Sequence, residues 1–185
     1  MASKILVIGF PETEETELII TVDVLRRAEL NVIIANLNDE EYFTCVQKTK
    51  IKADKLFKDV ENDMFDAVII PGGPGSYKVA NNERLVNFIK NHDKAGKFLG
   101  AICGAPVIFA QNKIGEGGKM TSYPKDQEKI EKAGYVYDKL DVVVSNNIIT
   151  SRAPGTAFEF ALKLVEILVG ETTSMELAKT LLYVQ

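Results

Sequence analysis

The sequence is poor in the residues that usually build metal centres. Its 185 residues include no tryptophan, a single histidine, His92, and two cysteines, Cys45 and Cys103, which form no CxxC pair. A zinc site of the usual kind takes its ligands from several cysteine and histidine side chains, and these three cannot supply a full set. We therefore expect no metal ion.

Long apolar runs and a surplus of basic residues are also missing. No run approaches the ~20 residues needed to cross a bilayer. The first apolar run, 5–10, has six residues and is followed by proline and acids, which is too short for the core of a signal peptide. Lysine and arginine number 22 against 26 acids, and the net charge is −4. We expect no membrane segment, no dedicated nucleic-acid surface, free thiols and a cytoplasmic location.

What remains is the composition of a globular protein. Hydrophobic residues make up 46% of the chain and charged residues 26%, both ordinary values. A chain of this length buries roughly 70% of its unfolded surface, so it can form a core without disulfides. There is no internal repeat, low-complexity tract or linker. We predict one domain spanning residues 1–185.

Apolar runs that are typical of strands alternate with segments of helical periodicity. This order predicts an α/β fold, a flavodoxin-like three-layer α/β/α sandwich with a mostly parallel sheet. In such a fold, ligand sites lie at the carboxyl edge of the strands. Strands are expected at 4–10, 31–36, 66–70, 97–102, 142–146 and 147–152, a hairpin across 43–53, and helices within 15–30, 77–92, from 106 onward, and within 122–134, 155–170 and 174–184.

Four strand-to-helix turns carry unusual residues, and all four are expected at that one edge. They contribute Glu17, the run "GGPG" that begins at Gly72, Cys103, and the segment "TSRAPGT", which contains Arg152 and Pro154. Four such features at one edge indicate a functional site more strongly than any of them alone.

The turn at Cys103 lies between small residues, Ala101 and Ala105. Small neighbours permit a sharp turn of the kind that exposes a nucleophile between a strand and a helix. A helix start also stabilises anions, so we expect the pKa of the thiol to be lowered and Cys103 to be a thiolate near neutral pH. The alternative is that Cys103 packs as a small buried hydrophobe.

Two other turns offer groups that suit a reactive thiol. The glycines Gly72 and Gly73 could present several N–H groups to a developing oxyanion, although they could equally form a plain turn. Glu17 could be an ordinary acid at the start of a helix. It could also be a desolvated carboxyl that keeps its proton and faces the thiolate.

His92 is expected to be a solvated residue at the end of a helix. That helix would run antiparallel to the strands, which places His92 near the amino edge and Cys103 at the carboxyl edge. A strand of five or six residues between the two edges spans roughly 17–20 Å. The sequence therefore argues against a Cys–His pair.

The segments "EETELIITVDVLRRA", "VIIPGGPGS", "AICGAP" and "TSRAPGTAFEFAL" resemble those of the DJ-one (Parkinson disease protein seven) family, within the ThiJ/PfpI superfamily. The resemblance spans nearly the whole chain. It implies a homodimer with a flavodoxin-like fold, in which Cys103 is the reactive cysteine and Glu17 its protonated partner. Gly72 and Gly73 would match the family's diglycine, and Arg152 and Pro154 would border the pocket with help from across the dimer.

The resemblance also implies activities: glyoxalase chemistry without glutathione, a deglycase activity, redox sensing and a chaperone role. Tyr123 is a further residue expected in the pocket, where it could donate a hydrogen bond. The sequence departs from the family at this position, since relatives often have histidine there and a tyrosine hydroxyl is a poor base at neutral pH. Peptidase-like members of the superfamily have histidine directly after the nucleophile, where this chain has Gly104. That difference argues against a protease.

These observations together favour a cofactor-independent glyoxalase that acts on small reactive aldehydes. Cys103 would form a hemithioacetal, backbone donors near Gly73 and Gly104 would stabilise the oxyanion, and Glu17 would move protons between the two carbons. The alternative function is a redox sensor or chaperone that acts through oxidation of Cys103 instead of turnover.

Overall fold

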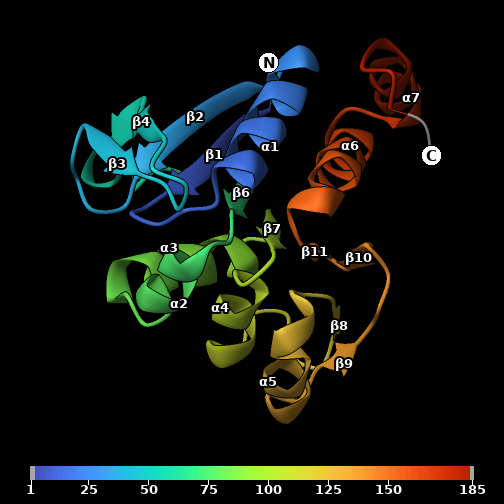
Figure 1. Ribbon diagram of the computed structural model, residues 1–185. Coiled ribbons are helices and arrows are strands. Elements are labelled where there is room, and N and C mark those ends of the chain that lie inside the picture. The colour runs from blue at the N-terminus through green and yellow to red at the C-terminus, as the bar shows by residue number, and fades with distance from the viewer. Residues whose placement is uncertain (1–2, 184–185) are drawn as a thin grey trace.

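A computed structural model describes residues 3–183 of the chain. Its main sheet has seven strands in the order β10-β11-β7-β6-β1-β2-β5, all parallel except the edge strand β10 (Figure 1). The strands are β1 (Lys4–Gly9), β2 (Asn31–Asn36), β5 (Lys55–Leu56), β6 (Ala67–Ile70), β7 (Phe98–Ile102), β10 (Val142–Ser145) and β11 (Ile148–Ser151).

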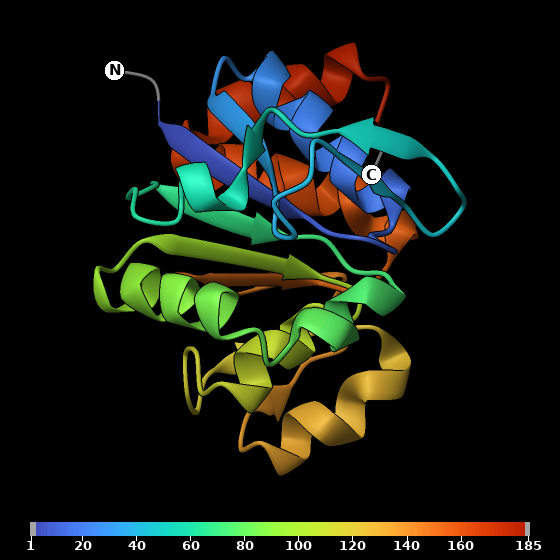
Figure 2. The ribbon, with the colours of Figure 1, turned by 90° about the vertical axis from the view of Figure 1, so that its left-hand side faces the viewer.

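Helices cover both faces of this sheet and make three layers (Figure 2). One face carries α1 (Glu15–Arg27), α6 (Ala157–Leu168) and α7 (Glu171–Thr180). The other carries α2 (Pro74–Val79), α3 (Glu83–Lys94), α4 (Pro106–Gln111) and α5 (Gln127–Lys132). Short 3₁₀ turns complete the set: η1 (Phe57–Asp59), η2 (Pro124–Asp126) and η3 (Pro154–Thr156).

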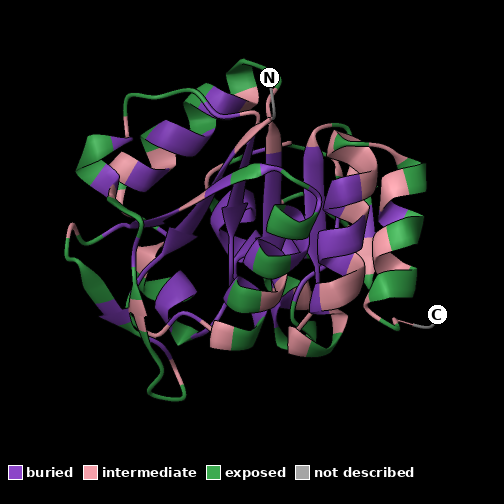
Figure 3. Ribbon diagram, turned by 90° about the horizontal axis from the view of Figure 1, so that it is seen from above, coloured by how far each residue is buried: buried purple, intermediate pink, exposed green. Residues whose placement is uncertain are grey.

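Strand β1 shows why the sheet is buried on both sides. Ile5 and Val7 pack into the core beneath α1 and α6, whereas Leu6 and Ile8 pack into the core beneath α3 and α4. Alternate side chains of a strand point to opposite faces, so a continuous apolar run is what a doubly covered strand requires. Figure 3 shows the strands buried between helices whose outer faces are exposed. The predicted flavodoxin-like sandwich is confirmed.

Both predicted antiparallel pairs are present. The hairpin of β3 (Tyr42–Thr44) and β4 (Lys50–Lys52) turns through Lys48, with φ 75°, and the β10–β11 hairpin turns through Asn146, with φ 55°. The sequence analysis missed β5 and the small parallel sheet of β8 (Lys119–Met120) and β9 (Val136–Tyr137). Each of these strands has only two residues, which is too short to give a periodic pattern.

Two helix predictions are corrected. The helix expected across 77–92 is two helices, because the Asn82 side chain accepts a hydrogen bond from the N–H of Leu85 at 3.1 Å and starts α3 anew. The last helix, expected at 174–184, runs from Glu171 to Thr180; residue 184 lies outside the described residues. No helix of the described chain has the length and apolar character to cross a membrane.

The expectation that His92 is solvated is wrong. Its side chain is buried, its Nε2 accepts a hydrogen bond from the N–H of Phe65 at 3.1 Å, and its Nδ1 contacts the carbonyl of Phe88 at 2.8 Å. Because the Phe65 nitrogen can only donate, Nε2 must be the acceptor and Nδ1 carries the hydrogen. His92 is a neutral core residue at the amino side of the fold.

Candidate active site

Cys103 lies on a strained turn between β7 and α4. It has φ 64°, a conformation that non-glycine residues seldom adopt, and its N–H donates to the carbonyl of Ser151 at 3.1 Å. Left-handed backbone of this kind costs ~1–3 kcal/mol and persists where the surrounding structure enforces it. The sharp turn predicted from the small neighbours is therefore present, and it holds the half-buried thiol at the carboxyl edge of the sheet.

The diglycine turn after β6 lies directly against Cys103. A methyl group placed on Gly72 would lie 2.5 Å from Cβ of Cys103 and 2.8 Å from Oε2 of Glu17, so any side chain would collide with both. The next glycine, Gly73, has φ 91°. The backbone N–H groups of Gly73 and Gly104 act on the Cys103 sulfur in the direction that lowers the pKa of its thiol. The turn thus allows close approach and supplies a backbone donor.

The first turn of α1 places Glu17 in this site with its side chain fully buried. The backbone N–H of Glu17 donates to the capping carboxylate of Glu14 at 2.7 Å, and Oε2 of Glu17 accepts from the N–H of Gly72 at 2.7 Å. The other carboxyl oxygen, Oε1, is buried and has no hydrogen-bond partner within residues 3–183. Since an unpartnered buried oxygen is costly, this oxygen is a natural place for a proton.

Burial raises the pKa of Glu17 from 4.5 to about 8. The hydrogen bond from Gly72 opposes this rise, the charge of Glu14 adds to it, and the contact with Cys103 opposes it. A carboxyl with this pKa is mostly protonated at pH 7. The sequence-based expectation of a carboxyl that keeps its proton beside Cys103 agrees with this environment.

The expectation of a lowered pKa for the Cys103 thiol is not met. Burial, and next the charge of an ionised Glu17, raise this pKa to about 12, against the hydrogen bonds from Gly73 and Gly104. Helix α4 begins only at Pro106 and has six residues, so its dipole lowers the thiol pKa by less than desolvation raises it. An ionised Glu17 therefore disfavours a thiolate at Cys103 still further than burial alone does.

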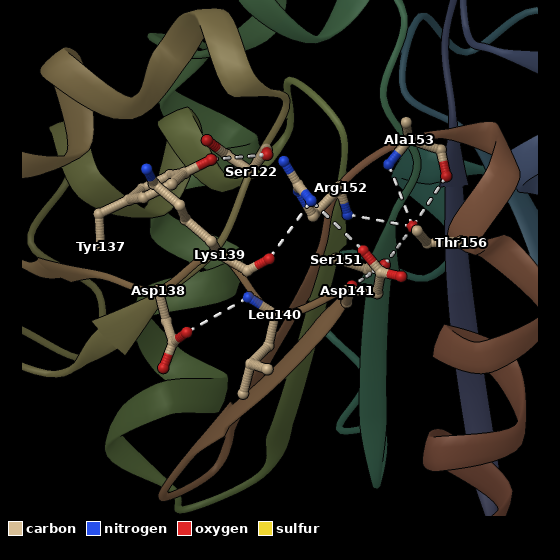
Figure 4. Close-up of polar contacts among 10 residues, drawn as sticks. All are labelled: Ser122, Tyr137, Asp138, Lys139, Leu140, Asp141, Ser151, Arg152, Ala153 and Thr156. Carbon is tan, nitrogen blue, oxygen red and sulfur yellow. Dashed lines mark hydrogen bonds and ion pairs between the residues drawn. The ribbon is translucent and has the colours of Figure 1, made fainter.

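The remaining predicted pocket residues fall into two groups. Tyr123 is adjacent to the turn, because its N–H donates to the carbonyl of Cys103 at 2.7 Å, and its side chain is 36% exposed. Pro154 begins η3, after β11. The Arg152 guanidinium instead reaches the carbonyl of Lys139 at 3.3 Å and the Asp141 carboxylate at 3.4 Å (Figure 4).

None of the hydrogen bonds of Arg152 is made to Cys103 or Glu17, within the part of the chain that the structure describes. The structure thus brings together Glu17, Gly72, Gly73 and Gly104 around Cys103, with Tyr123 beside them, whereas the Arg152 guanidinium contacts Lys139 and Asp141. A homodimer, and any pocket contact of Arg152 that would depend on it, stays a prediction.

Comparison with known proteins shows the family of this chain. The sequence model of the DJ-1/PfpI family matches residues 3–167. The chain belongs to the DJ-1/PfpI family. It is 41% identical to Protein dj-1beta of Drosophila melanogaster over 184 residues, covering 98% of each chain. It is 39% identical to the protein named glutathione-independent glyoxalase DJR-1.2 of Caenorhabditis elegans, covering 97% of this chain and 95% of that protein.

Solved structures of DJ-1/PfpI proteins have the same fold. The crystal structure of Drosophila melanogaster DJ-1beta superposes with a TM-score of 0.96 at 39% identity, and that of oxidized Toxoplasma gondii DJ-1 with 0.95 at 34% identity. Each covers 100% of both chains.

Beside this DJ-1/PfpI site the structure shows two residues that the sequence analysis missed. Tyr77 of α2 donates a hydrogen bond to the buried carboxylate of Asp126, at the end of η2, across 2.5 Å. The two are 49 positions apart in the chain, so no local pattern joins them. The position of Tyr77, four residues after the diglycine that the analysis did single out, was the only available signal.

Proposed function

We propose that this protein is a glutathione-independent glyoxalase that converts methylglyoxal to lactate and glyoxal to glycolate. The observation that carries the proposal is the buried Glu17 carboxyl, held by Gly72 against Cys103 with one oxygen free of partners. Isomerising a 2-oxoaldehyde requires a nucleophile for the aldehyde and an acid–base group beside it. Cys103 and Glu17 are such a pair.

The first step is addition of the Cys103 sulfur to the aldehyde carbon. A carbon–sulfur bond forms, the carbonyl π electrons move to oxygen, and the oxygen takes up the proton that the thiol gives up, by way of Glu17. The N–H groups of Gly73 and Gly104, which favour negative charge on the sulfur, would stabilise the developing oxyanion. The product is a hemithioacetal.

The second step moves hydrogen between neighbouring carbons. Once the sulfur is bonded to carbon it carries no charge, and Glu17 can ionise without facing a thiolate. Its carboxylate takes the proton from the former aldehyde carbon and returns it to the second carbon. The proton of the hemithioacetal hydroxyl passes to the ketone oxygen, so that the first oxygen becomes a thioester carbonyl and the second becomes the hydroxyl of the product. Water then cleaves the thioester, which releases the hydroxy acid and restores the thiol.

The name of the Caenorhabditis elegans relative supports this chemistry, since that protein is called a glutathione-independent glyoxalase and matches this chain almost from end to end. A deglycase activity, which would use the same addition to aldehyde-derived adducts, stays a prediction. Neither reaction needs a group beyond the residues described above.

The test is turnover of methylglyoxal to lactate by purified protein without glutathione. Cys103→Ser should abolish turnover, and Glu17→Gln should reduce it at least ~100-fold, the low end for a lost acid–base group. Cys45→Ser is the matched control, because Cys45 is the other free cysteine and is buried away from solvent. Wild-type protein that produces no lactate would contradict the proposal.

A second function is favoured by the different surroundings of the two cysteines. Burial raises the pKa of both thiols, to about 12 for Cys103 and about 11 for Cys45, but only Cys103 is accessible: it is half-buried, whereas Cys45 is 1% exposed. Oxidation should therefore select Cys103, which would suit a redox sensor. Turnover discriminates between the two functions, because a pure sensor shows none.

A further inference from the structure

A cluster of three polar residues borders the candidate active site and has no role in the chemistry above. Tyr77 donates to Oδ2 of Asp126 at 2.5 Å, and Nζ of Lys129 donates to Oδ1 of the same carboxylate at 2.6 Å. The Lys129 ammonium also lies 4.7 Å from the centre of the Tyr77 ring. Asp126 is 1% exposed, but Tyr77 is 41% exposed, so the cluster presents the tyrosine to solvent.

The tip of Tyr77 lies next to the residue that follows the nucleophile. A methyl group placed on Gly104 would lie 2.7 Å from both the hydroxyl oxygen and Cζ of Tyr77. The N–H of that same Gly104 hydrogen-bonds the Cys103 sulfur. The phenol oxygen therefore lies beside Gly104, and it is near enough to Cys103 for a charge on the sulfur to add to the rise that burial chiefly causes in the pKa of Tyr77.

The Tyr77 oxygen offers an acceptor there. Its single hydrogen is used in the bond to Asp126, and the two lone pairs of a tyrosine oxygen remain for other donors. Within the described residues no protein group donates to this oxygen. The backbone N–H groups at the sulfur are donors, so they cannot accept a hydrogen bond from a substrate hydroxyl.

We propose that Tyr77 is a substrate-binding residue that accepts a hydrogen bond from the hydroxyl of the hemithioacetal formed at Cys103. Asp126 and Lys129 are positioning residues, which hold the phenol with its lone pairs towards the sulfur. The ligand class is a small aldehyde, whose adduct carries a hydroxyl on the carbon bonded to sulfur. This inference rests on the proposed function, because it assigns a contact to that reaction's first intermediate.

The competing explanation is that the cluster only ties α2 to η2. A purely structural tie would alter the stability of the fold and the reactivity of Cys103 towards every reagent. A substrate contact, by contrast, affects only adducts that carry the hydroxyl. Iodoacetamide makes a thioether without a hydroxyl, so its reaction with Cys103 separates the two explanations.

The probe is acetaldehyde, which forms a hemithioacetal but has no second carbonyl and so cannot be isomerised. Its adduct protects Cys103 from iodoacetamide, and the concentration dependence of protection gives the affinity. We expect Tyr77→Phe to weaken protection about 5- to 10-fold, the effect of one lost hydrogen bond. Alkylation without aldehyde should stay within about twofold. Tyr135→Phe, which removes a hydroxyl bound to the carbonyl of Ile114, should change neither.

Asp126→Asn should weaken protection in the same direction, and the double variant should lose no more than Tyr77→Phe alone, because Asp126 acts through the phenol. Two results would overturn the inference. One is unchanged protection by acetaldehyde in Tyr77→Phe. The other is a rate of alkylation without aldehyde that falls by the same factor as the protection weakens. If Tyr77→Phe does not fold, Asp126→Asn decides by the same two measurements.

Turnover of methylglyoxal by the wild-type protein is measured separately. If the wild-type protein shows no turnover but its protection by acetaldehyde depends on Tyr77, the proposed glyoxalase function is refuted and the contact between Tyr77 and the aldehyde adduct is supported. Turnover with Tyr77-independent protection would refute the contact alone.

Discussion

Replacing Glu17 with glutamine should remove a large pH dependence from the stability of this protein. Burial raises the pKa of Glu17 to about 8 in the folded chain, against 4.5 for the free group. A group whose folded pKa is raised contributes stability that is fully present below pH 4.5 and is lost as pH rises through about 8. The reason is that the unfolded chain releases this proton at a lower pH than the folded chain does.

The size of the effect follows from the two pKa values. At ~1.36 kcal/mol for each pKa unit, the contribution of Glu17 to the free energy of unfolding falls by about 4 kcal/mol between pH 4.5 and pH 8. Glutamine keeps the shape of the side chain but does not titrate. The stability of Glu17→Gln relative to wild type should therefore rise across this range by up to that amount.

The assay is chemical denaturation of both proteins at several pH values between 4.5 and 8.5. A neighbour on the same helix provides a control with the opposite sign. Partial burial acts against ionisation of Glu15, but hydrogen bonds from Gln47 and Thr49 outweigh it and lower the pKa of Glu15. Glu15→Gln should therefore lose stability at neutral pH and recover it in acid. Parallel stability curves for wild type and Glu17→Gln would show that Glu17 is already ionised in the folded protein.

Three further predictions concern the same site and the core. Turnover and alkylation at Cys103 should rise with pH by up to about tenfold per unit and level off near 8, where Glu17 loses its proton; a flat profile from pH 6 to 9 would contradict this. Mild peroxide should convert Cys103 to sulfinate before Cys45 reacts, as peptide mass spectrometry can show, and preferential oxidation of Cys45 would count against it. His92 is buried in its neutral form, and its pKa is lowered chiefly through desolvation. Wild type should therefore lose stability below pH ~6.5 relative to His92→Gln. Equal acid sensitivity of the two proteins in denaturation would refute a buried neutral histidine.

The parts of the site that sequence predicts are those set by local chain geometry. The sharp turn at Cys103 follows from an apolar strand that ends between small residues, and the close approach of Gly72 follows from a diglycine after a strand. The layers of the fold follow from the alternation of strands and helices. Each of these features leaves a local pattern in the sequence, even though distant residues complete the contacts.

The parts that sequence could not predict depend on contacts between distant residues. His92 is buried because the backbone of Phe65, 27 positions away, donates to its ring. The raised thiol pKa depends on how far Cys103 and Glu17 are jointly desolvated, which is a property of the packed core. The sequence therefore predicts more solvent exposure for a histidine at a helix end and a cysteine at a turn than the two residues have in the folded protein.

The joint burial of Cys103 and Glu17 gives the proposed reaction its order. Two ionised groups so close together in a desolvated site would repel each other, so the pair holds at most one negative charge near neutral pH. Addition to an aldehyde needs that charge on sulfur, where Gly73 and Gly104 donate to it. Proton abstraction needs it on the carboxylate, where Gly72 donates. Formation of the carbon–sulfur bond neutralises the sulfur and permits the charge to move to Glu17. The covalent step thus switches Glu17 from proton carrier to base, and no further titrating group is required.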